Sequence, residues 1–159
     1  MQQAVFAAGC FWGVQYYFDQ VPGVVKTTVG YTGGHTKNPT YEDVCYKDTG
    51  HAEATLIEFD PKIIRYETLV KQFFYMHDPT QLNRQGPDVG DQYRSAIFYM
   101  DGAQQMIAEN VRDEVQEELG KQVVTDIKPA GEFYVAEDYH QKYTEKTGYG
   151  ACHKPFKKM

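Results

Sequence analysis

Cysteine is scarce in this sequence. Only Cys10, Cys45 and Cys152 occur, and their spacing forms neither a Cys-x-x-Cys pair nor a zinc-ligand pattern. An odd number of cysteines also fits poorly with the disulfide framework of a small secreted protein. We therefore expect no metal site and a cytoplasmic location, where cysteines serve catalysis or redox exchange.

Long hydrophobic runs and an excess of basic residues are lacking as well. No stretch approaches the roughly 18 apolar residues of a transmembrane helix, and no basic segment precedes the first apolar run. The chain has 16 Lys and Arg against 22 Asp and Glu, a net charge of −6. This balance argues against nucleic acid or a membrane as a partner. With no internal repeat or linker, residues 1–159 are expected to form a single domain.

The stretch around Cys10 is the most informative part of the chain. The apolar run 4–8 is followed by Gly9 and then by apolar residues near a 3.6-residue period, which predicts a strand, a tight turn and a helix. Cys10 would lie in the first turn of that helix, where free N–H groups and the helix dipole favour a thiolate. Cys10 is therefore a candidate nucleophile. The alternative is a small buried residue that packs the strand-helix junction.

The remaining elements alternate in a regular order. Further strands are predicted at 24–31, 51–59 and 95–100, and helices at 66–77 and 103–119. Two long segments without periodicity, 33–50 and 78–92, are expected to be functional loops, and 123–127 is a candidate fifth strand. The order β-α-β-β-α-β predicts an α+β fold with a ferredoxin-like split βαβ antiparallel sheet, followed by an extra C-terminal helix and a long irregular tail from Pro129.

Glu53 occupies an unusual place in the third predicted strand. Alternation puts it on the same face as Thr55, Ile57 and Phe59. A carboxylate so placed is either an edge residue that reaches solvent or a buried acid with a raised pKa. His77, at the end of the second predicted helix, could be a catalytic base or could complement the helix dipole.

The predicted topology brings several of these features to one edge of the sheet. The turn with Cys10, the start of the strand with Glu53 and both long loops all lie at the same end, with Tyr93 just after the second loop. This convergence favours Cys10 as a nucleophile over Cys10 as a packing residue.

Five sequence blocks carry a family resemblance: GCFWG at 9–13, GYTGG at 30–34, NPTYEDVC at 38–45, GHAEA at 50–54 and DQYRSAI at 91–97. Together, and in this order, they resemble peptide methionine sulfoxide reductase A over nearly the whole chain. The resemblance implies that the Cys10 thiolate attacks the sulfoxide sulfur and becomes a sulfenic acid. A poor leaving oxygen needs a neutral acid beside the thiolate, and Glu53 suits that role if burial keeps it protonated.

The same resemblance implies roles for the substrate-binding residues. Phe11 and Trp12 would line an apolar pocket for the methyl group, and the hydroxyls of Tyr41 and Tyr93 would bond the sulfoxide oxygen. Asp88 would anchor the substrate backbone. For each aromatic residue the alternative is core packing, and for Asp88 it is a role in a turn.

The sulfenic acid must be returned to a thiol, and a disulfide with a second cysteine is the reversible route. Cys152 lies in a glycine-bearing tail that could reach the site, whereas Cys45 matches a structural cysteine of the family. The family implies thioredoxin as the reductant of the disulfide, oxidised proteins and peptides as substrates, and no cofactor; we also expect a monomer. Thiol peroxidation, amide hydrolysis with His51 or His77 as base, and a non-enzymatic interaction domain are the alternatives.

Overall fold

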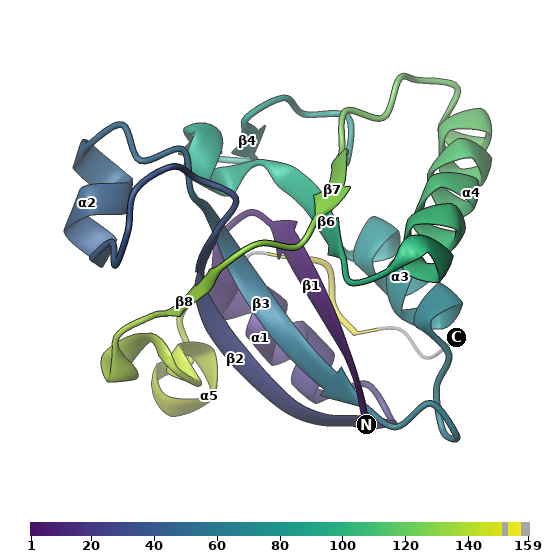
Figure 1. Cartoon of the computed structure of the whole chain (residues 1–159), viewed down its shortest axis with the longest axis horizontal. Helices are drawn as coiled ribbons and strands as arrows, with labels where there is room; N and C mark the ends of the chain where they lie inside the picture. Colours follow the sequence, from purple (N-terminus) through teal and green to yellow (C-terminus); the bar gives the residue numbers. More distant parts are fainter. Residues whose placement is uncertain (151–152, 157–159) are drawn as a thin grey trace.

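The computed structural model describes residues 1–150 and 153–156. A six-stranded sheet in the order β7-β6-β1-β3-β2-β8 runs through its centre (Figure 1). All neighbouring strands are antiparallel except β6 and β7, which are parallel. The six strands are β1 Gln2–Ala8, β2 Val24–Thr32, β3 Ala52–Phe59, β6 Ser95–Tyr99, β7 Asp126–Pro129 and β8 Phe133–Val135. The predicted mixture of helices with a mostly antiparallel sheet is confirmed.

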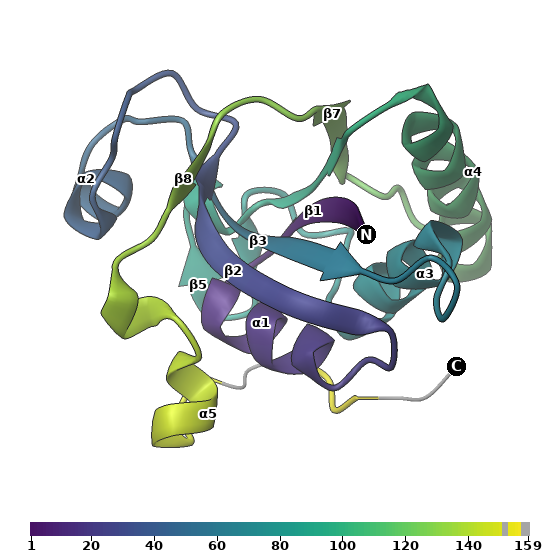
Figure 2. The ribbon, with the colours of Figure 1, turned by 60° about the horizontal axis from the view of Figure 1, so that its bottom comes forward.

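Helices cover one face of this sheet. They are α1 Phe11–Asp19, α3 Tyr66–Met76 and α4 Gly102–Leu119, and the main hydrophobic core lies between them and the strands. Figure 2 shows α1 lying along this face. Two short helices, α2 Tyr41–Tyr46 and α5 Tyr143–Thr147, lie outside this layer. No helix in the described part of the chain is long and apolar enough to cross a membrane.

The central strand β1 shows why its sequence is a continuous apolar run. Phe6 faces the helices, and its ring lies 5.6 Å from Phe18 and 5.1 Å from Phe73 between centroids. Val5 and Ala7 face the other side, in a smaller cluster covered by Phe133 and Ala130 from the C-terminal half. A strand buried on both faces has no polar side to alternate with.

The turn and loops that the predicted topology gathers at one edge of the sheet do meet there. Ala8, at the end of β1, pairs with Ser95 at the start of β6. Thr32, at the end of β2, pairs with Ala52 at the start of β3. The turn after β1, the loop after β2 and the loop before β6 therefore meet at one end of the sheet.

The two long loops contain structure that periodicity does not predict. Residues 33–50 include α2, whose N-cap Thr40 accepts a hydrogen bond from Asp43 N while the Asp43 carboxylate accepts one from Thr40 N. Residues 78–92 include a small hairpin, β4 Arg84–Gln85 with β5 Asp88–Val89. The predicted fifth strand begins later than expected, at Asp126.

We expect Thr40→Ala to lower the free energy of unfolding by about 1 kcal/mol, the usual effect of losing an N-cap side chain. Urea denaturation followed by circular dichroism measures it. Thr40→Ser keeps the hydroxyl and is the matched control. Equal stability of the alanine variant and the wild type would show that the capping box contributes nothing to α2.

Candidate active site

Cys10 is the N-cap residue of α1 and is partly exposed. The preceding Gly9 has a φ of +93°, a conformation that favours glycine and turns the chain sharply from β1 into α1. Val14 N donates to Cys10 O at 3.4 Å, the first bond of the helix. The predicted strand, tight turn and helix are therefore present, with the thiol at the positive end of the helix dipole.

Glu53 lies directly beside this helix start. Its side chain is only 1% exposed, and its Oε1 accepts a hydrogen bond from Phe11 N at 3.3 Å. Burial raises the pKa of Glu53 to about 8, although the bond from Phe11 opposes the shift. Oε2 has no hydrogen-bond partner in the described structure. Of the two sequence interpretations, the buried acid is the one observed.

The side chains predicted to surround Cys10 and Glu53 lie within electrostatic range of them. The pKa of Tyr93 is raised, first by burial and then by the charges of Glu53, Cys45, Asp88 and Cys10. The pKa of Tyr41 is raised by burial and then by Glu53. Asp88, in β5, in turn raises the pKa of Glu53. The geometry thus brings Cys10, Glu53, Tyr41, Asp88 and Tyr93 together.

Phe11 and Trp12 occupy different environments. Phe11 is fully buried, and its ring packs 5.7 Å from that of Tyr31. Trp12 is partly exposed, stacks on Tyr143 at 3.8 Å between centroids and donates its Nε1–H to His140 Nδ1 at 2.8 Å. Trp12 is therefore the more exposed of the two aromatics, and it packs against the buried cluster that contains Phe11.

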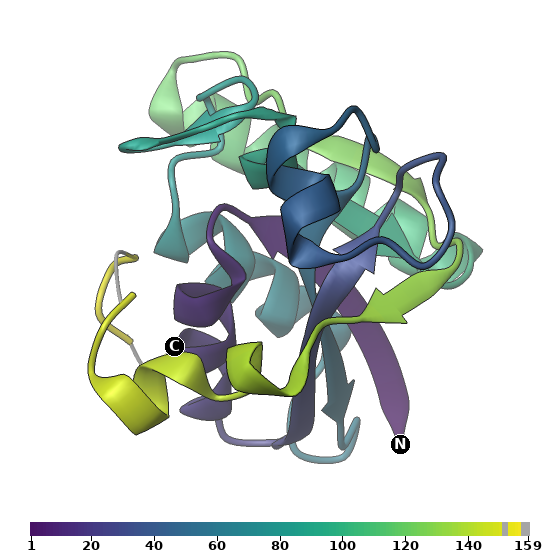
Figure 3. The same ribbon diagram turned by 90° about the vertical axis from the view of Figure 1, so that its left-hand side faces the viewer.

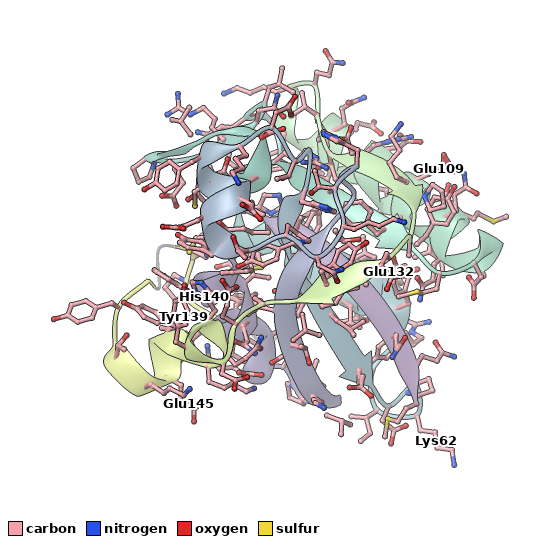
Figure 4. All side chains as sticks on the ribbon, turned by 60° about the vertical axis from the view of Figure 1, so that its left-hand side comes forward. Lys62, Glu109, Glu132, Tyr139, His140 and Glu145 are labelled. Atoms are coloured by element: carbon pink, nitrogen blue, oxygen red, sulfur yellow. The ribbon has the colours of Figure 1, made fainter. Side chains whose placement is uncertain are left out.

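Two residues that sequence reasoning missed hold these aromatics in place. His140 is fully buried and lies 4.4 Å from the ring of Tyr41. Glu137 accepts hydrogen bonds from the Tyr31 hydroxyl at 2.9 Å and from Tyr41 N at 3.0 Å. Both come from the segment between β8 and α5, where Figure 4 shows His140 next to Tyr139. The only signal was the density of Tyr, Glu and His after residue 132.

Cys45, which the family resemblance implies is structural, lies near the candidate site, because Tyr41 and Glu53 both act on its thiol. Helix α2 (Figure 3) carries it, and Val44 of this helix packs in the same buried cluster as Phe11. Burial raises the pKa of the Cys45 thiol, although hydrogen bonds with the side chains of Tyr41 and Gln92 oppose the shift. A raised pKa makes Cys45 a weak nucleophile near neutral pH.

Cys152 lies outside the described residues, but its neighbours on both sides lie against α1. The carbonyl oxygen of Gly150 is 2.9 Å from the position that a Cβ on Gly13 would take, and the ring of His153 crowds the same position. Gly13 is three residues from Cys10 in the first turns of α1.

Neither candidate histidine base is available for proton transfer. His77 is buried, with its ring nitrogens bonded to Phe73 O and Ser95 Oγ at 2.7 Å each, and burial lowers its pKa to about 3. His51 bonds Gly34 N at 3.0 Å and Thr36 O at 2.7 Å. Both rings hold structure, so a cysteine-histidine hydrolase is disfavoured. His77 does not complement the helix dipole as a cation either; it bonds the carbonyl of Phe73 as a neutral ring.

The donor set around Cys10 suits proton transfer to oxygen. Within residues 1–150 and 153–156, no group of three or more His, Cys, Asp or Glu side chains could hold a metal ion. A thiol at a helix N-terminus beside a neutral carboxylic acid can attack an electrophilic atom while the acid protonates its leaving oxygen.

Comparison with known proteins agrees with this chemistry. A family model described as peptide methionine sulfoxide reductase matches residues 2–159. A peptide methionine sulfoxide reductase MsrA from Methanosarcina mazei is 54% identical over 151 residues, covering 94% of this chain and 72% of that protein.

Solved structures are similar over nearly the full chain. Mxr1 from Saccharomyces cerevisiae in reduced form has a TM-score of 0.92 and 35% identity, covering 98% of this chain and 92% of that one. Mxr1 in complex with Trx2 has a TM-score of 0.67 and 25% identity, covering 98% and 90%.

We expect Glu53→Gln to stabilise the protein, and more so at high pH. The folded state holds the Glu53 proton up to about pH 8, whereas an unfolded chain releases it near 4.5. Between these values the unfolded state binds fewer protons, so stability falls as pH rises. Glutamine has no proton to release, so Glu53→Gln does not lose stability as pH rises. We expect it to raise the free energy of unfolding by about 2 to 5 kcal/mol at pH 9, since one pKa unit corresponds to about 1.4 kcal/mol.

Chemical denaturation at pH 5 and pH 9 measures the effect of Glu53→Gln. Glu58→Gln, the same substitution at a half-buried position of the same strand, is the control. A gain for Glu53→Gln that matches the control at both pH values would contradict a buried neutral acid.

Proposed function

This chain belongs to the peptide methionine sulfoxide reductase family, and from that membership we propose how its residues carry out the reduction. Cys10 is the nucleophile and Glu53 the general acid. The Cys10 sulfur attacks the sulfoxide sulfur while Glu53 protonates the departing oxygen. An S–S bond forms and the oxygen leaves as water; a water molecule then attacks the Cys10 sulfur, the S–S bond breaks and methionine is released. Two electrons have then passed from the Cys10 sulfur to the sulfoxide sulfur, and Cys10 carries a sulfenic acid.

The observation that carries this proposal is the state of Glu53. A carboxylic acid 1% exposed, with a pKa near 8 and one oxygen bonded by Phe11 N, keeps its proton at neutral pH. Oε2, which lacks a partner in the described structure, is then the oxygen able to carry that proton. A sulfoxide oxygen placed against it would receive both a hydrogen bond and, in the transition state, the proton.

The surrounding side chains support the substrate roles that the family resemblance implies. Tyr41 and Tyr93 keep neutral, donating hydroxyls because their pKa values are raised, so they can bind the developing charge on oxygen. Trp12, which is partly exposed, would form the apolar surface for the methyl group, supported by Phe11 in the same buried cluster. Asp88, on the hairpin next to the site, would anchor the substrate backbone.

This arrangement supports selectivity for one epimer. Sulfoxide sulfur is chiral, and each epimer is served by its own enzyme. With the oxygen held by Glu53, Tyr41 and Tyr93 and the methyl by Trp12, only one epimer presents its sulfur to Cys10. We propose that this is the S epimer, in peptides and as the free amino acid.

Cys152 is the proposed resolving cysteine. Its neighbours Gly150 and His153 both approach Gly13 of α1, which supports a short path to Cys10. Cys45, the other candidate, has a raised pKa. Thioredoxin is the proposed reductant of the resulting disulfide, because Mxr1, a structural relative of this chain, forms a complex with Trx2.

We also propose the ferredoxin-like description for the four central strands. The order β6-β1-β3-β2, with α1 and α3 on one face, supports it; β7 and β8 extend the sheet at its two edges. A single domain, a monomeric state and a cytoplasmic location stay predictions from the sequence.

We expect the S epimer of a methionine sulfoxide peptide to be reduced in a single turnover and the R epimer to remain. In Glu53→Gln the rate constant should fall on the order of 10²-fold, the effect of a lost general acid. Rapid quench and chiral chromatography measure both results.

Cys10→Ser is the blank for this single-turnover experiment, because a serine hydroxyl without a partner base is a poor nucleophile. Methionine formed by Cys10→Ser would contradict Cys10 as the nucleophile. An unchanged rate in Glu53→Gln would contradict Glu53 as the general acid, and consumption of both epimers at one rate would contradict selectivity for one epimer.

We expect Cys152→Ser to release about one methionine per enzyme and then stall with thioredoxin, because the sulfenic acid has no partner. A small thiol that attacks the sulfenic acid directly should restore turnover. Cys45→Ser is the matched control and should cycle normally with thioredoxin. Stalling in Cys45→Ser with free cycling in Cys152→Ser would transfer the resolving role to Cys45.

A further inference from the structure

His153, the residue after Cys152, is anchored to the loop that carries Cys10. Its Nε2–H donates to the carbonyl oxygen of Ala8 at 2.5 Å. Ala8 is the last residue of β1, two positions before Cys10. The imidazole therefore ties the tail to the turn between β1 and α1, across 145 residues of sequence.

Two glycines make room for this ring. A Cβ on Gly13 would collide with His153 Nδ1, and a Cβ on Gly9 would lie 3.4 Å from Nε2. Gly9 is also required by its positive φ, but Gly13 is an ordinary helical residue. His153 and Gly150 O thus occupy the space that a side chain at Gly13 would need. These two glycines and Ala8 O together form a slot for the imidazole, which we call the glycine slot.

The ring in the glycine slot also lies near the hairpin that carries Asp88. A Cβ on Gly9 would be 2.8 Å from Gln85 Cβ, and the charge of Asp88 acts on His153. The side chain is half-buried, and Nδ1 has no hydrogen-bond partner in the described structure. A side chain enclosed by three separate segments has few rotamers open to it, so it can hold its own backbone in place.

We propose that His153 is a positioning residue for the step in which Cys152 resolves the sulfenic acid on Cys10. The proposal rests on the resolving role of Cys152 given above. In this step the Cys152 thiolate attacks the Cys10 sulfur, an S–S bond forms, and the S–O bond breaks. Hydroxide leaves and is protonated to water; the Cys152 sulfur is oxidised and the Cys10 sulfur is reduced.

The rate of such an intramolecular step depends on how often the two sulfur atoms meet. Gly148 and Gly150 both have positive φ values and give the tail its bends on one side of Cys152. On the other side the imidazole in the glycine slot is the first anchored side chain. Lys154 N also bonds Met76 O at 3.2 Å, and Phe156 packs on Tyr17. The tail therefore stays attached without the imidazole, and its loss should slow resolution without abolishing it.

The experiment follows the full-length enzyme after one equivalent of a methionine sulfoxide peptide, without reductant. Quenched samples are analysed by mass spectrometry for methionine, for sulfenic acid trapped by dimedone, and for the Cys10–Cys152 disulfide. In His153→Ala we expect the methionine burst to keep its rate while disulfide formation slows about tenfold and sulfenic acid accumulates. Because only folded enzyme gives the burst, the second rate constant refers to folded molecules.

Two further variants separate positioning from general effects on the tail. His153→Gln can still place an amide N–H near Ala8 O and should recover part of the rate. Lys154→Ala is the matched control: it removes a side chain that lies 5.1 Å over the ring of Tyr75, away from the glycine slot, and should resolve at the wild-type rate.

The outcomes are distinct. A wild-type rate of disulfide formation in His153→Ala, or equal slowing in Lys154→Ala, would overturn the positioning role. Equal slowing of the methionine burst and the disulfide in His153→Ala would also overturn it, since His153 would then support α1 in general. A disulfide that maps to Cys45 in the wild type would instead refute the resolving role of Cys152.

Discussion

The bond between Phe11 N and Glu53 Oε1 is the contact on which the site depends. It joins the first turn of α1 to β3, and so fixes the carboxyl of Glu53 beside the thiol-bearing N-cap. The pairing of Tyr31 with Glu53 and of Phe6 with Thr55 sets the height of Glu53 in the sheet. One N–H cannot offset the loss of water around a buried carboxylate, so burial raises the pKa of Glu53.

Periodic burial explains what could be predicted from the sequence. The alternation around Glu53 places it on the helix-covered face, and the register of β1, β2, β3 and β6 gathers the loops at one edge. The helix predicted at 66–77 is also confirmed, as Tyr66–Met76. Each of these features follows from the spacing of apolar residues along one strand or helix. That spacing shows which side of the element is buried, and it can be read from a single sequence.

The parts that were missed depend on partners far along the chain. Glu137 and His140 bond Tyr31, Tyr41 and Trp12, which lie 96 to 128 residues earlier, and no local pattern records such pairings. Helix α2 is different, because Thr40 and Asp43 form a capping box visible in the sequence; six residues are too few for a periodicity to show. His77 was considered as a catalytic base or as a cation at the helix end, whereas burial lowers its pKa and its ring nitrogens bond Phe73 O and Ser95 Oγ.

The proposed chemistry places opposite demands on the acid and on the resolving thiol. The acid must be enclosed to keep its proton, and Glu53 is built into β3, a strand that pairs with both β1 and β2. A resolving thiol, by contrast, must be able to approach Cys10 after the substrate has left, and the described residues Gly150 and His153, which flank the proposed resolving Cys152 in sequence, come from outside the sheet. Gly13 lies where the two meet: its missing side chain lets the tail pass within reach of α1 without disturbing the contact between Phe11 and Glu53. A glycine in a helix normally lowers stability by about 1 kcal/mol, and close approach of the tail is the physical reason for tolerating that loss at this position.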